Sequence, residues 1–219
     1  MACLLYCVTL ANRDPIQNLI GVAERPVVAH DFDELRVYWS EVANPEPLVE
    51  AASRKPAELR YQQVLREIVI RTTAIAFPLP AVVADLEDVY ALVSEQHERY
   101  VQALGRLADT VQYELTATWA DDERADLATP VKGREYLERR QETQARVAAI
   151  DAKLRTLAAG IVREWRSRQE RRKHLWFALL TRDDRERFLA ALRSAGSSEG
   201  VRLRLSGPWP PGEFVRAQQ

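Results

Sequence analysis

Alternating apolar and polar positions predict that the first third of the chain forms a sheet. Leu35, Val37 and Trp39 recur at every second position of residues 34–43, the period of a strand with one buried face. Residues 3–10 (CLLYCVTL) are mostly of types that favour strands. Further elements are predicted at 16–22 (short helical stretch), 26–32 (strand), 56–71 (helix) and 74–80 (strand), with a hairpin turn near Asp31–Asp33. This order predicts a ferredoxin-like module in residues 1–80, an antiparallel sheet with helices on one face.

Two long stretches with helical periodicity dominate the remainder of the chain. Across residues 82–107, mostly apolar residues recur at intervals of four and three and would form a stripe, here called a seam, along one face of a helix. These residues are Leu86, Tyr90, Val93, His97, Tyr100, Leu104 and Leu107. Residues 133–173 carry a second seam: Val147, Ile150, Leu154, Leu157, Ile161 and Trp165. This spacing is typical of coiled coils, so the two helices are predicted to pack as a coiled-coil-like pair, unless each binds a partner helix elsewhere.

The other elements complete a second module at residues 81–219. Strands are predicted at 109–119, 174–181 and 201–206, a helix at 182–195, and loops at 44–47, 120–129 and 196–200. The predicted fold class is therefore α+β in two modules. The second is an α+β module that contains both long helices.

Charge is distributed unevenly along the chain, although the net charge is only −1. Residues 1–131 hold 11 Lys and Arg against 21 Asp and Glu, residues 132–173 hold 13 against 6, and residues 174–219 hold 7 against 5. An acidic first part and a basic central helix predict electrostatic complementarity, within the chain or with partners.

No apolar run approaches the roughly 20 residues of a membrane span, and the first residues lack the basic region of a secretory signal. We therefore expect a cytoplasmic protein that does not bind membranes. Cys3 and Cys7 would share one face of a strand with their Cα atoms about 13 Å apart, too far for a disulfide. We expect two buried, reduced thiols.

The sequence carries no recognisable catalytic or cofactor motif. It has no G-x-S-x-G and no glycine-rich phosphate loop. His97 lies on a helix seam and His174 begins a strand, whereas His30 stands near Asp31 and Asp33, where a metal site is conceivable. We predict a protein that is not an enzyme and holds neither a metal nor a cofactor.

The basic helix at 133–173 raises the question of nucleic-acid binding. The aromatic pattern of an RNA-binding ferredoxin-like sheet is absent, and six acidic residues are interspersed among the helix's bases. A solvated helix, or one that faces the acidic N-terminal part, explains the charge better. We expect no nucleic-acid partner.

Trp209 lies between Pro208 and Pro210, in a segment that can be neither a helix nor a central strand. Prolines restrict φ, so this segment should be stiff and extended. Either it folds back and Trp209 covers the core, which we favour, or Trp209 is presented to a partner.

Two motifs resemble those of gas vesicle accessory proteins of the GvpF/GvpL family. VRLRLSGPWPPGEFV (201–215) is similar to the end of those proteins, where a strand runs into Gly-Pro-Trp-Pro-Pro and then an aromatic residue. KGREYLERR (132–140) resembles the Gly-x-x-Tyr-Leu-x-x-Arg start of the family's long helix. The early aromatic-containing strand and the β–α–β ending agree in position, so the resemblance covers essentially the whole chain. The residues that carry it are Gly133, Tyr136, Leu137, Arg140, Gly207, Pro208, Trp209, Pro210, Pro211 and Phe214.

The resemblance implies a gas vesicle accessory protein without catalytic activity. Its expected partners are the small, very hydrophobic shell protein and other gas vesicle accessory proteins, which it would bind during assembly in a chaperone-like or minor structural role. The candidate surfaces are the helices 82–107 and 133–173 and the edge of the N-terminal sheet. The alternative is a small-ligand enzyme or sensor on a ferredoxin-like scaffold, because fold does not decide function.

Overall fold

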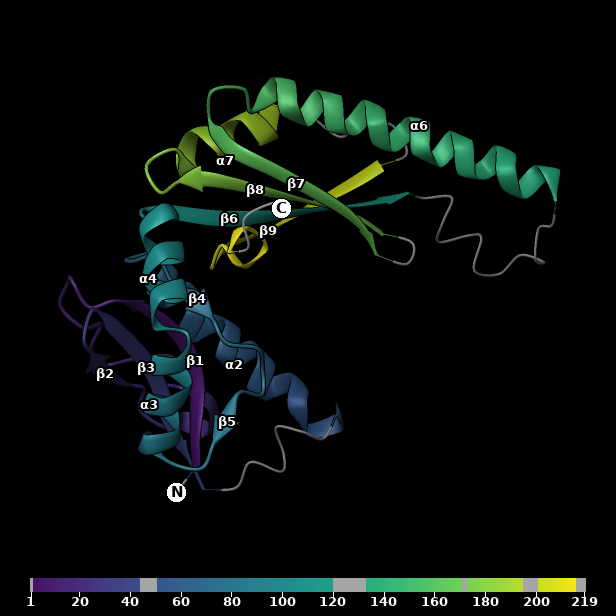
Figure 1. Cartoon of the computed structure of the whole chain (residues 1–219). Coiled ribbons are helices and arrows are strands. Elements are labelled where there is room, and N and C mark those ends of the chain that lie inside the picture. Colours follow the sequence, from purple (N-terminus) through teal and green to yellow (C-terminus); the bar gives the residue numbers. More distant parts are fainter. Residues whose placement is uncertain (1, 44–50, 120–132, 171–172, 195–200, 216–219) are drawn as a thin grey trace. The chain divides into compact units, whose positions relative to one another are not determined.

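The structure is a computed structural model that describes residues 2–43, 51–119, 133–170, 173–194 and 201–215 (Figure 1). The loops predicted at 44–47, 120–129 and 196–200 lie outside these residues. Two compact units are present: the first is Met1–Gln112 with Pro208–Gln219, and the second is Tyr113–Gly207. The units thus divide after Gln112, whereas the sequence placed the module boundary at residue 80.

The first unit is built on an antiparallel sheet of short and medium strands. Its members are β1 (Ala2–Leu10), β2 (Val28–Phe32), β3 (Leu35–Val42), β4 (Ile75–Ala76) and β5 (Val82–Val83). Their order is β2-β3-β1-β4, and β5 also pairs with β1. The predicted hairpin is present, because β2 and β3 pair across Phe32 and Leu35. Of the strand predicted at 74–80, only β4 forms.

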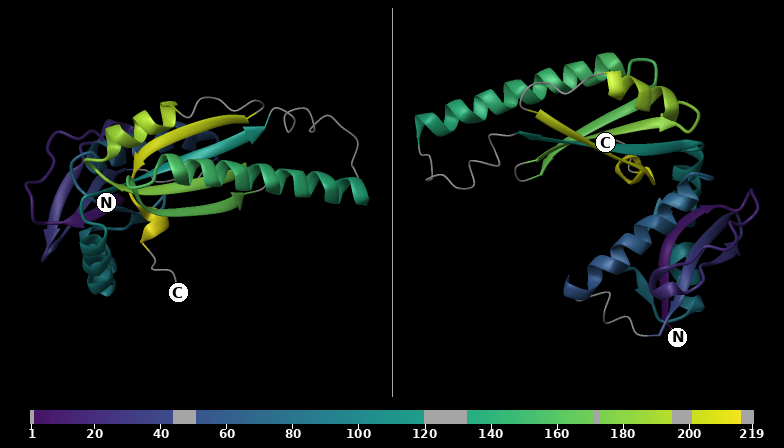
Figure 2. Two further views of the ribbon diagram at one scale, coloured as in Figure 1. Left: turned by 90° about the horizontal axis from the view of Figure 1, so that it is seen from above. Right: turned by 180° about the vertical axis from the view of Figure 1, so that it is seen from behind.

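Helices cover both faces of this sheet. On one face, α3 (Leu86–Glu95) and α4 (His97–Arg106) contribute Val89, Val93 and Leu104 to a core that includes Leu35 and Val37 of β3. On the other face lies α2 (Ala51–Val69), whose Tyr61 stacks on Tyr6. The view from behind in Figure 2 has α2 in front of the sheet.

The structure does not confirm a complete ferredoxin-like module in the first unit. That module has its helices on one face of the sheet, whereas here they lie on both. The helical stretch predicted at 16–22 is also missing, and the segment between β1 and β2 contains only the 3₁₀ turn η1 (Val22–Glu24). What is established is the coarser α+β class.

The described residues of the second unit have the element order β-α-β-β-α-β. It consists of β6 (Thr110–Trp119), α6 (Arg134–Leu157), β7 (Val162–Glu170), β8 (Lys173–Thr181), α7 (Arg185–Ser194) and β9 (Val201–Trp209). The sheet order is β7-β8-β6-β9. If β5 is set aside, both sheets of the described residues have the same order when their strands are counted along the chain: second, third, first, fourth.

Helices α6 and α7 pack on the same face of the second unit's sheet (Figure 1). Trp176 of β8 donates from Nε1 to Asp151 of α6 at 3.0 Å. Trp165 of β7 contacts the ring of Phe188 in α7, with centroids 6.3 Å apart. Trp165 pairs with Ala178 in the β7–β8 register, which places it on the same side as Trp176.

The predicted helix at 133–173 is wrong in its second half. The helix ends at Leu157, and Gly160 then takes a φ of 71°, a conformation that commonly ends helices. Residues 162–170 form β7 instead. The prediction extends the helix because Ile161 and Trp165 continue the three-and-four spacing of its seam. The many charged side chains of β7 leave no visible alternation of apolar and polar residues that would indicate a strand.

The predicted helix at 82–107 is two helices, with a break at Gln96. Two of its seam positions, Leu86 and Tyr90, are exposed, whereas Val89 and Ala103 are buried in the first unit's core. In the second unit α6 contacts α7. Each helix thus packs within its own unit, and the predicted coiled-coil pairing is not confirmed.

Candidate functional site

The proline-framed segment, which comprises the last two residues of β9 and those that follow, folds back into the first unit. We call residues Pro208–Val215 the C-terminal strap. Pro208, Pro210 and Pro211 are buried, and Phe214, in the 3₁₀ turn η2 (Gly212–Phe214), is 0% exposed. The strap is therefore held by Phe214, a buried aromatic anchor that the sequence indicates only as one residue of a motif.

Polar groups of the first unit bind the main chain of the strap. Arg106, in the last turn of α4, donates from Nη2 to the carbonyl oxygen of Phe214 and to that of Val215 at 3.0 Å. The side-chain oxygen of Gln112 accepts from the amide of Glu213 at 3.1 Å. Main-chain groups that are shielded from water need such partners.

Trp209 is half-buried beneath a cation. The guanidinium carbon of Arg66, in the last turn of α2, lies 4.7 Å from the indole centroid, within the range of a cation–π interaction. The segment does fold back as predicted. However, Phe214 is the fully buried aromatic residue, and Trp209 covers the core only in part.

The second motif marks the start of α6 in the second unit. Gly133 directly precedes the helix with a φ of 71°, and its carbonyl oxygen accepts from the amide of Leu137 at 3.3 Å. Tyr136 lies in the first turn of this helix. Leu137 is 56% exposed and Arg140 is exposed, so neither is a core residue. The two motifs thus belong to different units.

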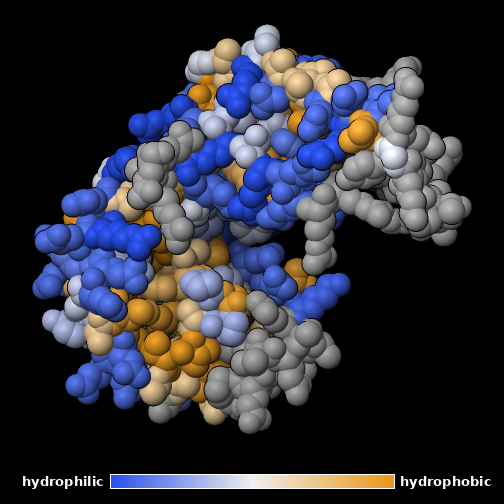
Figure 3. All heavy atoms as spheres, turned by 45° about the vertical axis from the view of Figure 1, so that its right-hand side comes forward, coloured by the Kyte–Doolittle hydropathy of each residue, from blue (hydrophilic) through white to orange (hydrophobic). Residues whose placement is uncertain are grey.

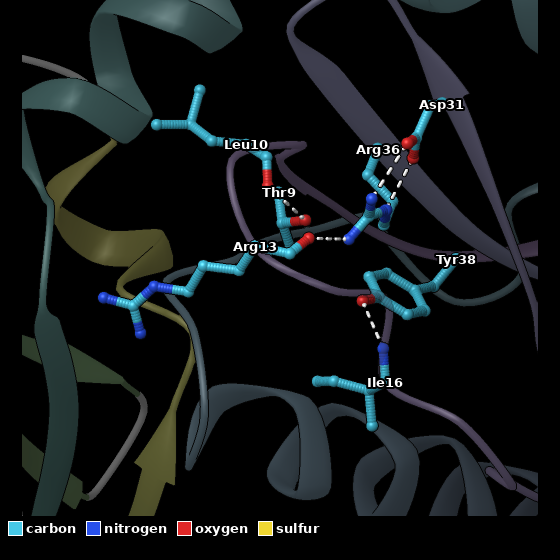
Figure 4. A network of polar contacts seen from close by, with 7 residues as sticks. All are labelled: Thr9, Leu10, Arg13, Ile16, Asp31, Arg36 and Tyr38. Atoms are coloured by element: carbon cyan, nitrogen blue, oxygen red, sulfur yellow. Dashed lines mark hydrogen bonds and ion pairs between the residues drawn. The ribbon is translucent and has the colours of Figure 1, made fainter.

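A polar network fixes the segment between β1 and β2 (Figure 4). Arg36 of β3 binds Asp31 through two hydrogen bonds and donates from Nη1 to the carbonyl oxygen of Arg13 at 2.5 Å. The hydroxyl of Tyr38 accepts from the amide of Ile16 at 3.2 Å. These contacts hold the segment against the sheet face that also carries α2.

A surface cavity of about 610 Å³ lies beside this network. The residues that line it include three arginines and two acidic residues: Arg13, Arg36, Arg71, Asp14 and Glu67. The charges are mixed, and the lining has neither histidine nor cysteine. Because the lining comes from β1, β3, the segment after β1 and the end of α2, no local motif in the sequence predicted it.

Aromatic rings form a row at the edge of the first sheet where β2 lies. The centroid of His30 lies 4.7 Å from that of Phe32, which lies 5.7 Å from that of Tyr90 in α3. Tyr90 is 54% exposed and Val28, on the same side of β2, is 41% exposed. Figure 3, in which the side of the first unit with α2 and β5 comes forward, shows a further area of apolar surface away from β2. We call Val28, His30, Phe32 and Tyr90 the β2–α3 surface.

The histidines do not assemble a metal site in the described part of the chain, where no group of three or more ligating side chains occurs. Asp31 is engaged by Arg36 rather than by His30. His97 lies with Nε2 3.0 Å from Glu34. Burial lowers the pKa of His174, and its ring lies 4.3 Å from that of Trp176.

Both cysteines are buried in β1 and neither forms a disulfide. Burial raises the pKa of the Cys3 and Cys7 thiols, which disfavours the reactive thiolate.

Comparison with known protein families shows which family the chain belongs to. The chain matches the family described as gas vesicle synthesis protein GvpL/GvpF over residues 2–216. The chain belongs to this family. Its role therefore lies with gas vesicles, and both motifs fall inside the matched range. No curated protein sequence matches the chain significantly.

Two crystal structures share the fold of this GvpL/GvpF family member. Gas vesicle protein GvpF from Microcystis aeruginosa is 14% identical, with a TM-score of 0.75 and 99% of each chain covered. GvpF from Anabaena sp. PCC7120 is 16% identical, with a TM-score of 0.74, covering 100% of this chain and 97% of that one. Within the described residues of this family member, every helix is too short or too polar to span a membrane.

Proposed function

We propose that this GvpL/GvpF family member binds the gas vesicle shell protein and other accessory proteins during gas vesicle assembly, in a chaperone-like or minor structural role. Family membership supports the setting, and the β2–α3 surface supports the binding. A hydrophobic shell protein needs a partner that covers apolar surface before it is incorporated.

The β2–α3 surface combines two means of recognition. In the described part of the chain β2 pairs only with β3, so its other edge offers main-chain groups to an added strand. Beside that edge, Val28 and Tyr90 offer apolar contact area. A segment that adds to β2 would bury its alternate side chains against the aromatic row.

The assembly role is tested by omitting the protein from a reconstituted gas vesicle gene cluster. We expect no vesicles by electron microscopy and no flotation of cells, with recovery when the protein is resupplied. Normal vesicles without it would reject the role.

The binding surface is tested separately, with the purified chain and immobilised shell protein. Tyr90→Ser should weaken capture, because it removes an exposed ring from the aromatic row. Leu59→Ser is the matched control, since Leu59 is 61% exposed but lies on α2, at the other face of the sheet. Equal capture by both variants would move the binding surface away from β2 and α3.

A second candidate, a small-ligand enzyme or sensor, rests on the cavity beside Arg36. It requires saturable binding of a small molecule, detected as a rise in Tm, that is weakened by Arg71→Ala at the cavity wall. A metabolite panel that leaves Tm unchanged would remove this candidate without affecting the assembly role.

A further inference from the structure

The C-terminal strap meets the first unit through contacts of the kinds that bind peptides. Phe214 is an anchor with 0% exposure. Arg106 and Gln112 bind main-chain atoms of the strap, so these hydrogen bonds do not depend on the identity of the strap's side chains. The Arg66 guanidinium lies above the Trp209 ring. A few well-buried residues, among which tryptophan, tyrosine and arginine are enriched, carry most of the binding energy at interfaces between separate molecules.

The surface that receives the strap is built by elements that have their own packing. Arg66 lies in the last turn of α2, whose Tyr61 and Ile68 are buried, and Arg106 is the last residue of α4, whose Leu104 lies in the core. These helices therefore present both arginines without help from the strap.

The strap carries its own local structure. The amide of Gly212 donates to Pro210 at 2.7 Å, and that of Phe214 donates to Pro211 at 2.9 Å. Its three prolines fix φ at Pro208, Pro210 and Pro211. A segment that is stiff before it binds loses little conformational entropy on binding.

We propose that the surface beneath the strap is a peptide-binding site of the first unit, whose ligand is the segment Pro-Trp-Pro-Pro-Gly-Glu-Phe. The chain's own strap fills this site in the structure. The same segment of a second copy has the same chemistry and fits the same site. The strap is then a separable ligand, and the rest of the first unit remains folded when the strap leaves.

The first test supplies the ligand in trans to the full chain. Phe214→Ala weakens the chain's own strap while it leaves Arg66, Arg106 and Gln112 in place. A fluorescent peptide of residues 207–215 should bind this variant saturably in an anisotropy titration. The same peptide with Phe214 replaced by Ala should bind roughly thirty-fold more weakly or worse, the effect of losing a buried aromatic anchor.

Two controls tie the binding to the proposed site. The wild-type chain should bind the peptide far less than the variant, because its own strap occupies the site. The double variant with Arg106→Ala should bind less than Phe214→Ala alone, because it lacks the donor to both carbonyl oxygens. A folded Phe214→Ala chain that does not bind the peptide would overturn the proposal.

A mixture of two variants distinguishes the two sources of the ligand. Phe214→Ala has an intact site and a weak strap, whereas Arg106→Ala has an intact strap and a weak site. If a second copy can supply the strap, sedimentation should detect dimers in the mixture but not in either variant alone. Peptide binding without mixed dimers would assign the site to the chain's own strap.

Hydrogen exchange on the wild-type chain decides the proposal even if Phe214→Ala does not fold. The amides of Glu213 and Phe214 should exchange through a local opening, faster than the β1 amides, and added peptide should not change β1. Exchange of strap and β1 amides in one global event would show that the strap is an inseparable part of the core, and would overturn the proposal.

Discussion

Arg36 and Asp31 form a two-pronged ion pair across the β2–β3 hairpin. Nε of Arg36 lies 2.5 Å from Oδ1 of Asp31, and Nη2 lies 2.8 Å from Oδ2. The arginine side chain is only 7% exposed, whereas that of the aspartate is 52% exposed. The pair therefore neutralises a buried cation with a carboxylate that water still reaches.

Removing the aspartate should destabilise the protein, because it leaves the buried guanidinium without a counter-ion. We expect Asp31→Ala to lower the free energy of unfolding by about 3 kcal/mol, near the lower end of the range for breaking buried pairs. Urea unfolding followed by circular dichroism measures the change. Glu170→Ala is the control: it breaks an exposed pair with Arg168 (2.7 Å) and should cost about 0–1 kcal/mol. Equal costs for both variants would contradict this account of the Arg36 site.

The same pair should make stability depend on pH in the acid range. The hydrogen bonds from Arg36 hold the pKa of Asp31 below its ordinary value. A carboxyl whose pKa is lowered by folding stabilises the protein above its unfolded pKa of about 3.9 and loses that contribution as pH falls through the lowered value.

Wild-type urea midpoints should therefore fall on acidification below about pH 4 more steeply than those of Asp31→Asn. Asp184 is an internal reference, because its pKa is also lowered, mainly by its hydrogen bond with Thr181, and it is unchanged in both proteins. Parallel pH profiles for wild type and variant would exclude Asp31 as the source of the acid dependence.

The sequence predicts those strands in which apolar and polar side chains alternate clearly. In β6, Tyr113 and Leu115 are buried and Glu114 and Thr116 are half-buried, and the predicted bounds differ from the observed ones by one residue. In β7, by contrast, charged side chains surround Trp165, and the alternation is not visible. Trp165 is recognisable as an inward residue only after Phe188 has been placed beside it.

The candidate site was partly predictable for a similar reason. Two adjacent prolines and a tryptophan make the strap a local signal, so the sequence identified it. The position of Phe214 was not predictable in the same way. The side chains that bind the main chain around it, Arg106 and Gln112, are about a hundred positions away in the sequence. The Arg36–Asp31 pair follows from the hairpin register, in which these two residues face each other, but the predicted turn was too loosely placed to give that register.

Trp209 should contribute less to stability than a fully buried tryptophan. We expect Trp209→Ala to cost about 1–2 kcal/mol, against about 3–5 kcal/mol for a buried aromatic side chain. A double-mutant cycle with Arg66→Ala should give a coupling energy of about 0.5–1 kcal/mol, from the cation above the ring. A coupling near zero would show that the two side chains are adjacent without interacting.

Tyr61 should stabilise the first unit through its hydroxyl as well as its ring. The hydroxyl approaches the carbonyl oxygens of Tyr6 (2.9 Å) and Phe77 (2.5 Å), and the side chain is buried in α2. In Tyr61→Phe the Tyr6 oxygen keeps the amide of Phe77 as a donor at 3.0 Å, so the principal loss is at Phe77. We expect a cost of about 1–2 kcal/mol in urea unfolding, the range for one buried carbonyl left without its donor. Tyr90→Phe, at an exposed ring, should be close to neutral. If Tyr61→Phe were equally neutral, the packing of α2 against the sheet would rest on the stacked rings of Tyr6 and Tyr61 alone.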